Sequence, residues 1–444
     1  MENASPPRIL IVGLDRYGMR ACVRLGLEVT VVCGTAVWDQ GHIAIPDEVT
    51  VIRVDDHTSA EAVLMALARA GLTSQSFDAV YTTAEDSLVM VGLLAAHLGL
   101  PAVPPDVAVR FRDKSVQKRE IRAAGLATAA AVVVDDVHDV RDVAAITELA
   151  SAKAVLKPVA GAATERTTVV SSVADLRSRS KEYRRQGTAQ RTFILEEFVR
   201  GEEWIADGVL YQGELLFCAL GRYGDPCLTA VDSGRPLNFR HFDPADESWA
   251  YDRALPVITA SLAALGLRDG AFHMELFHDP ETGALTFGEC AARRGGALVQ
   301  EVVHAKFNVD LAACAIQVAL GRRPEIDVKI RPGAIGGAYL TAGPGLLLDC
   351  PSADQVMARP GVEFVRIERP VGDRTPAVSG TDHRIGQFMV AADTAEELQQ
   401  RFAKVWDWFG PQVKIVPDGL TPRELRALQP TLRPGVRFGD ALWR

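Results

Sequence analysis

Short apolar runs alternate with helical patterns along roughly the first hundred residues of the chain. Three β-branched runs favour strands, at 8–13 (RILIVG), 28–33 (EVTVVC) and 78–83 (DAVYTT). Stretches at 59–71 and 85–99 have the spacing of helices that pack on one side. Because strands and helices alternate in this order, the pattern predicts a parallel sheet covered by helices.

Beyond this region the pattern changes twice. A proline-rich connector at 99–106 precedes a helical pattern that begins in RFRDK and ends at Gly125. A second boundary near Arg322–Pro324 precedes glycine-rich strand runs, and 394–410 reads as an amphipathic helix whose aromatic residues belong in a core. We therefore expect three regions, 1–105, 106–322 and 323–444, in an α/β protein with an α+β C-terminal part.

Composition narrows the function classes. The 444 residues are 48% hydrophobic and 24% charged, with a formal net charge of −9 and no basic stripe, which argues against a dedicated nucleic-acid binder. Seven single cysteines form no C-x-x-C pair and favour reduced thiols. Without a signal-peptide pattern or a membrane-spanning apolar run, we expect a cytoplasmic protein.

The first strand-to-helix turn, GLDRYG, offers a dinucleotide site as one interpretation. It holds Gly13 and Gly18 but lacks the middle glycine that lets the backbone approach a pyrophosphate, and no Lys-Ser/Thr follows for a P-loop. An ordinary strand-turn-helix is the better interpretation.

Two lysines stand where charge needs an explanation. Lys114 follows Asp113 at the opening of a helix, where a lysine is usually solvated. Lys157 closes an apolar strand before Pro158, and burying an ammonium is costly without an anion nearby. The hydroxyl-rich segment 161–168 that follows suits a flap over phosphates.

Acidic residues interrupt three apolar strands farther along. One strand ends in Glu196-Glu197, with Phe198-Val199 and Glu203 close behind. Two others carry Glu275 and Glu289 and are joined by the short turn PETG, which predicts a hairpin. If the two carboxylates converge, a divalent cation such as Mg²⁺ relieves their repulsion. A surface strand that ends in a charged turn is the alternative interpretation of LTFGECAARRGG, at 285–296.

Taken in order, these stretches resemble the ATP-grasp superfamily, and especially carboxylate–amine ligases of the bacilysin-synthetase L-amino acid ligase type. The resemblance runs through YTTAEDSLVMVGLLAAHLGLPAVPP, RDK, GAFHMELF, FGECAARRGG and SGTDHRIGQFMVAADTAEELQQRFAKV, and so covers most of the chain. It implies an N-terminal pre-ATP-grasp α/β domain at 1–105, an ATP-grasp nucleotide- and metal-binding region at 106–322, and a C-terminal substrate or closing region at 323–444.

The resemblance also implies a role for each position. Lys114 and Lys157 would hold the ATP phosphates, and Glu203 the ribose. The hinge from Glu196 through Glu197 and Phe198 to Val199 would read adenine, partly through its main chain. Glu275 and Glu289 would ligate Mg²⁺ or Mn²⁺. Arg293 and Lys157 would be the catalytic cations, and Arg293 would neutralise an acyl phosphate or a substrate carboxylate. Gly295 and Gly296 would allow close approach of the backbone.

Two departures from the family pattern stand out. Ala291 occupies the position where many ATP-grasp enzymes have asparagine, which leaves fewer protein ligands for the metal. Ala163 and Arg166 occupy flap positions where glycine is common. His273 alternates onto the face of Glu275 and either assists the site or is a satisfied structural histidine.

The expected activity is an ATP-dependent ligase that joins two small amino acids through an acyl phosphate, giving a dipeptide or γ-glutamyl-type amide, ADP and phosphate. Its partners would be small carboxylates and amines, with no nucleic acid or membrane, and a homodimer is left open. Two alternatives remain: a biotin-carboxylase-like activator of bicarbonate, and a non-catalytic nucleotide-binding regulatory protein.

Overall fold

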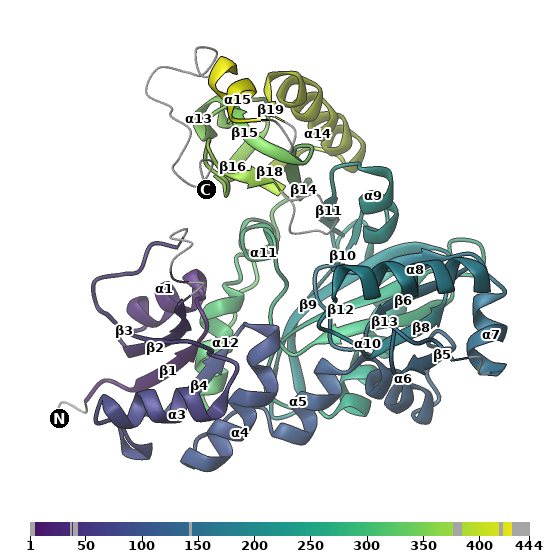
Figure 1. Ribbon diagram of the computed structural model, residues 1–444. Helices are drawn as coiled ribbons and strands as arrows, with labels where there is room; N and C mark the ends of the chain where they lie inside the picture. The colour runs from purple at the N-terminus through teal and green to yellow at the C-terminus, as the bar shows by residue number, and fades with distance from the viewer. Residues whose placement is uncertain are drawn as a thin grey trace.

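The computed structural model of the protein has three lobes (Figure 1). It describes residues 5–35, 38, 43–141, 144–375, 384–416 and 421–428. The start of the stretch SGTDHRIGQ, residues 379–383, and the end of the C-terminal region, residues 429–444, lie outside the described residues.

The N-terminal lobe is a four-stranded parallel sheet, as predicted, in the order β3-β2-β1-β4. Its strands are β1 (Arg8–Val12), β2 (Glu28–Gly34), β3 (Val49–Val54) and β4 (Ala79–Thr82). The prediction missed β3, although VTVIRV alternates as a strand does. The neighbouring helices are α1 (Arg16–Arg24), α3 (Ala60–Arg69), η1 (Ser74–Ser76), η2 (Glu85–Ser87) and α4 (Leu88–Leu98).

The connection to the next lobe contains two helices, α5 (Pro105–Arg112) and α6 (Lys114–Ala123), so the single helix predicted across RFRDK is wrong. Asp113 separates them, because its extended backbone ends α5 and its Oδ1 accepts hydrogen bonds from the amides of Ser115 and Val116, at 2.8 and 3.1 Å. The cap places Lys114 at the first position of α6, as the sequence indicated.

A small antiparallel sheet follows, in the order β5-β8-β6-β7. Its strands are β5 (Ala131–Val134), β6 (Ala154–Pro158), β7 (Thr168–Val170) and β8 (Phe193–Glu197), and its helices are α7 (Ala144–Ala150) and α8 (Val173–Gln186). The apolar side chains of these elements form their own cluster, which leaves Lys157 and Glu196 at strand ends beside a cavity.

An eight-stranded sheet forms the centre of the molecule, in the order β13-β12-β9-β10-β11-β14-β18-β16. Its strands are β9 (Glu202–Tyr211), β10 (Glu214–Tyr223), β11 (Asn238–His241), β12 (Gly270–His278), β13 (Leu285–Ala291), β14 (Ala334–Thr341), β16 (Val362–Ile367) and β18 (Arg384–Ala392). The helices α9 (Cys227–Ser233), α10 (Ser248–Leu265), α11 (Val299–Phe307) and α12 (Leu311–Ala319) lie among them.

The two faces of this sheet have different cores. Trp204 packs with residues of α10 on one face, whereas Ile205 packs with residues of α11 on the other. Successive side chains of a strand point to opposite faces, so neighbouring residues of β9 serve separate regions. Helix α12 contacts α1, and its Ala312 and Ile316 join the core of the N-terminal sheet.

The C-terminal lobe is a continuation of the same sheet, because β14, β18 and β16 pair with it and with each other (Figure 1). Its other elements are β15 (Gly345–Asp349), β17 (Arg374–Thr375), β19 (Lys414–Val416), α13 (Ala353–Met357), α14 (Ala395–Phe409), η3 (Gly410–Gln412) and α15 (Pro422–Leu428). The aromatic residues of α14 are core residues, as predicted: Phe402 is buried and stacks with Trp406 at 5.8 Å.

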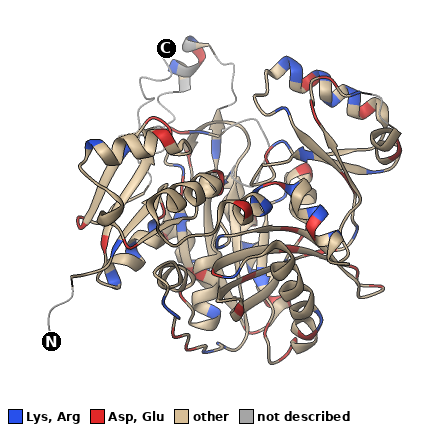
Figure 2. Cartoon of the chain, turned by 90° about the horizontal axis from the view of Figure 1, so that it is seen from below, with Lys and Arg blue, Asp and Glu red and all other residues tan. Residues whose placement is uncertain are grey.

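Figure 2 shows basic and acidic residues interspersed along the elements, in keeping with the sequence. In the described part of the chain, no single helix has the length and apolarity to cross a membrane. Helices α11 and α12 pass that test only as a pair, which is bent by 101°.

Candidate functional site

A cavity of about 790 Å³ lies between the small sheet and the central sheet, and we call it the main cavity. Every position that the sequence singled out for nucleotide, metal or catalysis lines it. These are Lys114, Lys157, Glu196, Glu197, Phe198, Val199, Glu203, Glu275, Glu289 and Arg293. Residues up to 179 positions apart in the chain therefore share one cavity, since the set runs from Lys114 to Arg293.

The lysines form one side of the main cavity. Lys114 donates a hydrogen bond to the carbonyl of Gly161 at 2.8 Å, and its Nζ lies 3.3 Å from Glu289. Lys157 Nζ lies 3.1 Å from Glu196 and 3.6 Å from Glu289. Burial disfavours the charge of Lys157, but these two carboxylates outweigh it and raise the pKa of its ammonium. Lys157 is thus held as a cation.

Lys118 completes this side of the cavity, and the sequence reading missed it. It is one turn along α6 from Lys114, only 3% exposed, and its Nζ donates to the carbonyl of Gly288 at 2.7 Å and lies 3.5 Å from Glu196. Burial lowers the pKa of Lys118 to about 8. The i, i+4 spacing on an amphipathic helix was the signal that could have found it. We call Lys114, Lys118 and Lys157 the lysine wall.

The predicted hairpin is confirmed, because β12 and β13 are antiparallel and Glu275 is the direct partner of Glu289. Burial opposes the ionisation of Glu289, but Lys114 and Lys157 outweigh it and lower its pKa to about 2. Glu203 behaves in the opposite way: burial, and then the charge of Glu275, raise its pKa to about 8. We call Glu203 and Glu275 the carboxylate wall.

The carboxylates fit a divalent cation. Glu203, Glu275 and Glu289 line one cavity, where burial and then the charge of Glu275 raise the pKa of Glu203. Among the residues that the structure describes, no group of three or more His, Cys, Asp or Glu is arranged to hold a metal ion alone. The donor set therefore suits Mg²⁺, which commonly uses one or two protein carboxylates and takes its other ligands from phosphates and water.

The predicted hinge closes the end of β8. The amide of Glu197 donates to the carbonyl of Ala130 at 2.8 Å, and the amide of Phe198 donates to the carbonyl of Lys153 at 3.2 Å. These two N–H groups are therefore engaged with protein. Glu203 is 5% exposed and accepts a hydrogen bond from the amide of Cys227 at 2.8 Å.

Lys153, which stands just before β6, is solvated, as its place before the strand indicated. It is exposed, but it lines the main cavity and its Nζ lies 3.6 Å from the centre of the Phe198 ring. A lysine over an aromatic face is attracted to it, so Lys153 supports the hinge from outside.

The flap between β6 and β7 has a strained backbone. Ala163, Thr164 and Arg166 adopt positive φ values of 54°, 56° and 53°. Residues with a Cβ rarely take this left-handed conformation, which costs about 1–2 kcal/mol each. The flap thus keeps a glycine-like shape at Ala163 and Arg166 without the glycines, and Ala163 and Thr164 line the cavity.

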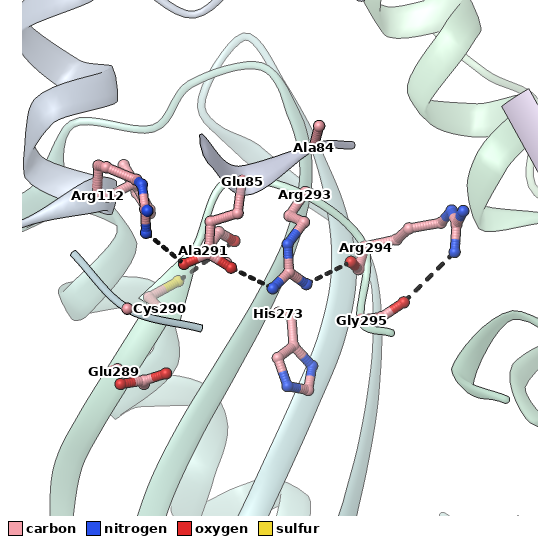
Figure 3. A network of polar contacts seen from close by, with 12 residues as sticks. Ala84, Glu85, Arg112, His273, Glu289, Cys290, Ala291, Arg293, Arg294 and Gly295 are labelled. Carbon is pink, nitrogen blue, oxygen red and sulfur yellow. Dashed lines mark hydrogen bonds and ion pairs between the residues drawn. The ribbon is translucent and has the colours of Figure 1, made fainter. Parts of the chain in front are cut away.

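Arg293 is held by the N-terminal lobe. It donates hydrogen bonds to Glu85 and, at 3.0 Å, to the carbonyl of Arg294, and Glu85 also accepts from Arg112 at 3.4 Å (Figure 3). Because a guanidinium has five N–H donors, Arg293 keeps further donors for a ligand while Glu85 positions it. Neither Glu85 nor Arg112 was singled out from the sequence.

The glycine after these arginines is required by packing. A Cβ on Gly295 would lie 2.6 Å from Asp207 and 2.9 Å from His273, whereas one on Gly296 would meet nothing within 4 Å. Asp207 accepts a hydrogen bond from the amide of Gly295 at 2.9 Å and lies 3.0 Å from Nδ1 of His273. His273 lines the cavity beside Glu275, so it has both a structural partner and access to the site.

The C-terminal lobe contributes two residues that sequence reasoning missed. Tyr339 of β14 and Arg384 of β18 line the main cavity, and the guanidinium of Arg384 lies 4.8 Å from the ring centre of Tyr339. Arg384 also donates to Glu368 at 2.7 Å. Only the pairing of β14 with β18 brings these positions together, and no sequence spacing indicates it.

A small antiparallel sheet beside a lysine- and carboxylate-lined cavity is the arrangement that the resemblance to ATP-grasp proteins implied. Residues 19–102 match the family model of the ATP-grasp N-terminal domain. Residues 338–408 match that of the L-amino acid ligase C-terminal domain 2.

Individual relatives agree with these domain matches. The chain is 23% identical over 367 residues to the L-arginine-specific L-amino acid ligase of Bacillus subtilis, covering 82% of this chain and 85% of that protein. Its structure is similar to that of the L-amino acid ligase of Bacillus licheniformis, with a TM-score of 0.73 and 20% identity over 94% of this chain and 100% of that one. The resemblance drawn from the sequence and the ATP-grasp fold class are confirmed.

The fold is shared more widely. The biotin carboxylase of Campylobacter jejuni matches with a TM-score of 0.64 and 17% identity, covering 92% of each chain. Fold alone therefore does not choose between a ligase and the bicarbonate-activating alternative.

Proposed function

We propose that the protein is an ATP-dependent carboxylate–amine ligase that joins two amino acids. A carboxylate oxygen attacks the γ-phosphorus of ATP, the bond from that phosphorus to the bridging oxygen breaks, and ADP leaves. The amine then attacks the acyl phosphate, loses a proton, and expels phosphate to leave an amide. The single observation that carries this proposal is the convergence of all the expected residues on one cavity.

The proposed roles follow the charges. Lys114 and Lys157, which both lie beside Glu289, would bind the phosphates and offset the charge that spreads over the transferring phosphoryl group. Lys118 would add a third cation when protonated. Arg293, oriented by Glu85, would neutralise the acyl phosphate or the substrate carboxylate.

Glu275 and Glu289 would hold Mg²⁺ or Mn²⁺, which, when bound, would neutralise charge on the nucleotide phosphates. The hinge at 196–199 would bind the adenine ring, and Glu203 the ribose. The flap at 161–168 would cover the phosphates and exclude water. We keep the division into regions 1–105, 106–322 and 323–444 as part of this proposal.

Amino acids are the proposed substrates because two features support them. The C-terminal residues 338–408 match a domain named for L-amino acid ligases, and the curated relative is named as specific for L-arginine. In this chain the same lobe places Arg384 and Tyr339 at the cavity. A cytoplasmic location, and a homodimer, stay predictions.

The test is to trap the intermediate. The protein would be incubated with ATP, Mg²⁺, hydroxylamine and each amino acid in turn. We expect an amino acid hydroxamate that requires ATP and Mg²⁺, with ADP as the nucleotide product. Phosphate release across pairs of amino acids would then identify the natural pair.

Other outcomes separate the alternatives. AMP and pyrophosphate would indicate an adenylating enzyme and refute the phosphoryl-transfer mechanism. ATP hydrolysis stimulated by bicarbonate, with no hydroxamate from any amino acid, would favour the biotin-carboxylase-like alternative. Tight ATP binding with no substrate-dependent turnover would favour the regulatory one.

A further inference from the structure

A second cavity, of about 380 Å³, lies behind the main cavity on the other face of the central sheet, and we call it the rear cavity. Four adjacent strands line both cavities, and on each of them a residue of one cavity is next in sequence to a residue of the other. The pairs, main cavity first, are Glu203 and Glu202 on β9, Tyr223 and Arg222 on β10, Phe239 and Arg240 on β11, and Phe277 and His278 on β12. One thickness of sheet therefore separates the two cavities.

Aromatic rings form one part of the rear cavity. Trp249, at the start of α10, is 47% exposed, and its ring centre lies 5.6 Å from that of buried Trp204 and 6.2 Å from that of Phe242. His278 stacks on Trp204 with ring centres 4.2 Å apart. An exposed indole above a layer of buried rings offers a flat apolar surface to a planar ligand.

Three arginines also line the rear cavity. Arg222 is paired with Glu202, and Arg240 forms a two-pronged pair with Glu247, with both contacts at 2.7 Å. Arg253 differs from them, because it has no carboxylate partner among the described residues.

Arg253 is nevertheless held in place. It donates to the carbonyl of Gly283 at 3.1 Å, and its guanidinium lies 6.0 Å from the ring centre of Trp249. Gly283 is needed for this approach, since a Cβ there would lie 1.7 Å from Arg253 Nη1. A fixed cation that lacks an anion therefore stands beside the exposed indole ring.

His278 supplies an independent sign of a missing partner. It lines the rear cavity and is only 5% exposed, and its Nε2 has no hydrogen-bond partner within the described parts of the chain. Its Nδ1 lies 3.4 Å from Glu202. Buried polar atoms in folded proteins nearly always have a partner, and leaving one unpaired costs about 1–3 kcal/mol.

We propose that the rear cavity binds a small aromatic carboxylate. The ring would lie against Trp249, and the carboxylate would pair with Arg253. The arginines outnumber the two glutamates of the lining by one, which favours a monoanion over a neutral or cationic ligand. The proposal is independent of the ligase activity.

The test uses 2-naphthoate as the probe, with its uncharged amide and cyclohexanecarboxylate as matched controls, and isothermal titration on the full chain. We expect naphthoate to bind at least about tenfold more tightly than either control, which is about 1.4 kcal/mol. Trp249→Ala and Arg253→Gln, both changes of exposed side chains, should each weaken binding by about tenfold or more. Arg119→Gln, a change of an exposed arginine on α6, should leave the affinity unchanged.

Lys157→Ala separates this site from the main cavity. Lys157 lines the main cavity, which lies on the other face of the central sheet from the rear cavity. This variant should therefore bind naphthoate as tightly as the parent protein. Loss of binding in Lys157→Ala would assign the probe to the main cavity and overturn the proposal. Equal binding of naphthoate and its amide, no binding of naphthoate, or full binding by Arg253→Gln would overturn it as well.

Discussion

The lysine wall and the carboxylate wall of the main cavity differ in how well their charges are satisfied. The three lysines share Glu196 and Glu289, and these two carboxylates have lowered pKa values because cations surround them. Glu203 and Glu275 lie across the same cavity, and the pKa of Glu203 is raised to about 8 because burial and its neighbour disfavour a second negative charge. One wall pairs its charges within the protein, and we propose that a metal ion pairs with the other.

Glu289 is the residue that links the two walls. Glu289, from the β12–β13 hairpin, lies beside Lys114 and Lys157 of the lysine wall and is the direct strand partner of Glu275 of the carboxylate wall. A phosphate chain laid between the walls would take over the lysines, and its metal would take over the carboxylates. We expect Glu289 to be the most sensitive position for that reason.

The largest expected effect is that of Glu289→Gln. The change keeps the shape of the side chain but removes the charge that the proposed metal and two lysines use. Turnover should fall by at least about a hundredfold, because metal stabilisation of phosphoryl transfer is worth several kcal/mol. Steady-state ADP formation measures the effect. Glu281→Gln, in the exposed turn of the same hairpin, is the control and should be normal. A near-normal rate at saturating Mg²⁺ would remove Glu289 from the site.

Lys157→Ala should be next in size. The change removes a buried ammonium that touches both Glu196 and Glu289, so ATP should bind at least about tenfold more weakly and turnover should fall with it. Titration with ATP measures the loss, and a melting curve checks the fold.

Two other lysines make this comparison sharper. Lys181→Ala, on the exposed side of α8, should have no effect, whereas Lys153→Ala should have a small one because Lys153 packs on Phe198. If Lys153→Ala and Lys157→Ala weakened ATP binding equally, the phosphate site would have to lie elsewhere.

A third prediction concerns pH. Burial lowers the pKa of Lys118 to about 8, so in the free protein this lysine loses its proton as the pH rises from 7 to 9. Bound phosphates would favour the protonated form, so ATP binding should take up a proton and weaken as the pH rises, by at most about tenfold per unit. Titrations in buffers of different ionisation enthalpy measure the proton. Lys118→Met should abolish the uptake, and a parent-like slope in that variant would contradict the assignment.

The chain order of the site could be read from the sequence, because each signal was local. Glu275 and Glu289 stand in two apolar strands joined by a short turn, so a hairpin could be predicted, whereas their direct pairing depends on the shift of register between Glu275 and Leu276. Lys157 could be identified from the sequence because an ammonium at the end of a buried strand needs an anion nearby. The parallel N-terminal sheet followed from its alternating pattern.

The parts that could not be read depend on contacts between distant segments. Glu85 reaches Arg293 across 208 positions, and Arg384 enters the cavity only because β18 pairs with β14. Lys153 looked solvated because exposure to water and proximity to a site are separate properties. The single helix expected through RFRDK failed because an aspartate cap outweighed the continuous helical pattern.

The smallest expected effect tests the flap that would close over the lysine wall. Ala163 holds φ at +54° with no benefit from its methyl group that would offset the strain. Ala163→Gly should therefore stabilise the protein by about 0.5–1 kcal/mol. This figure is the strain that glycine relieves minus the larger conformational entropy that glycine has in the unfolded chain. Ala152→Gly, at an exposed position without positive φ, should destabilise it by a similar amount. Denaturant unfolding of the two variants measures the difference. If both changes were destabilising, the left-handed backbone at Ala163 would not be the strained element that separates this flap from a glycine-rich one.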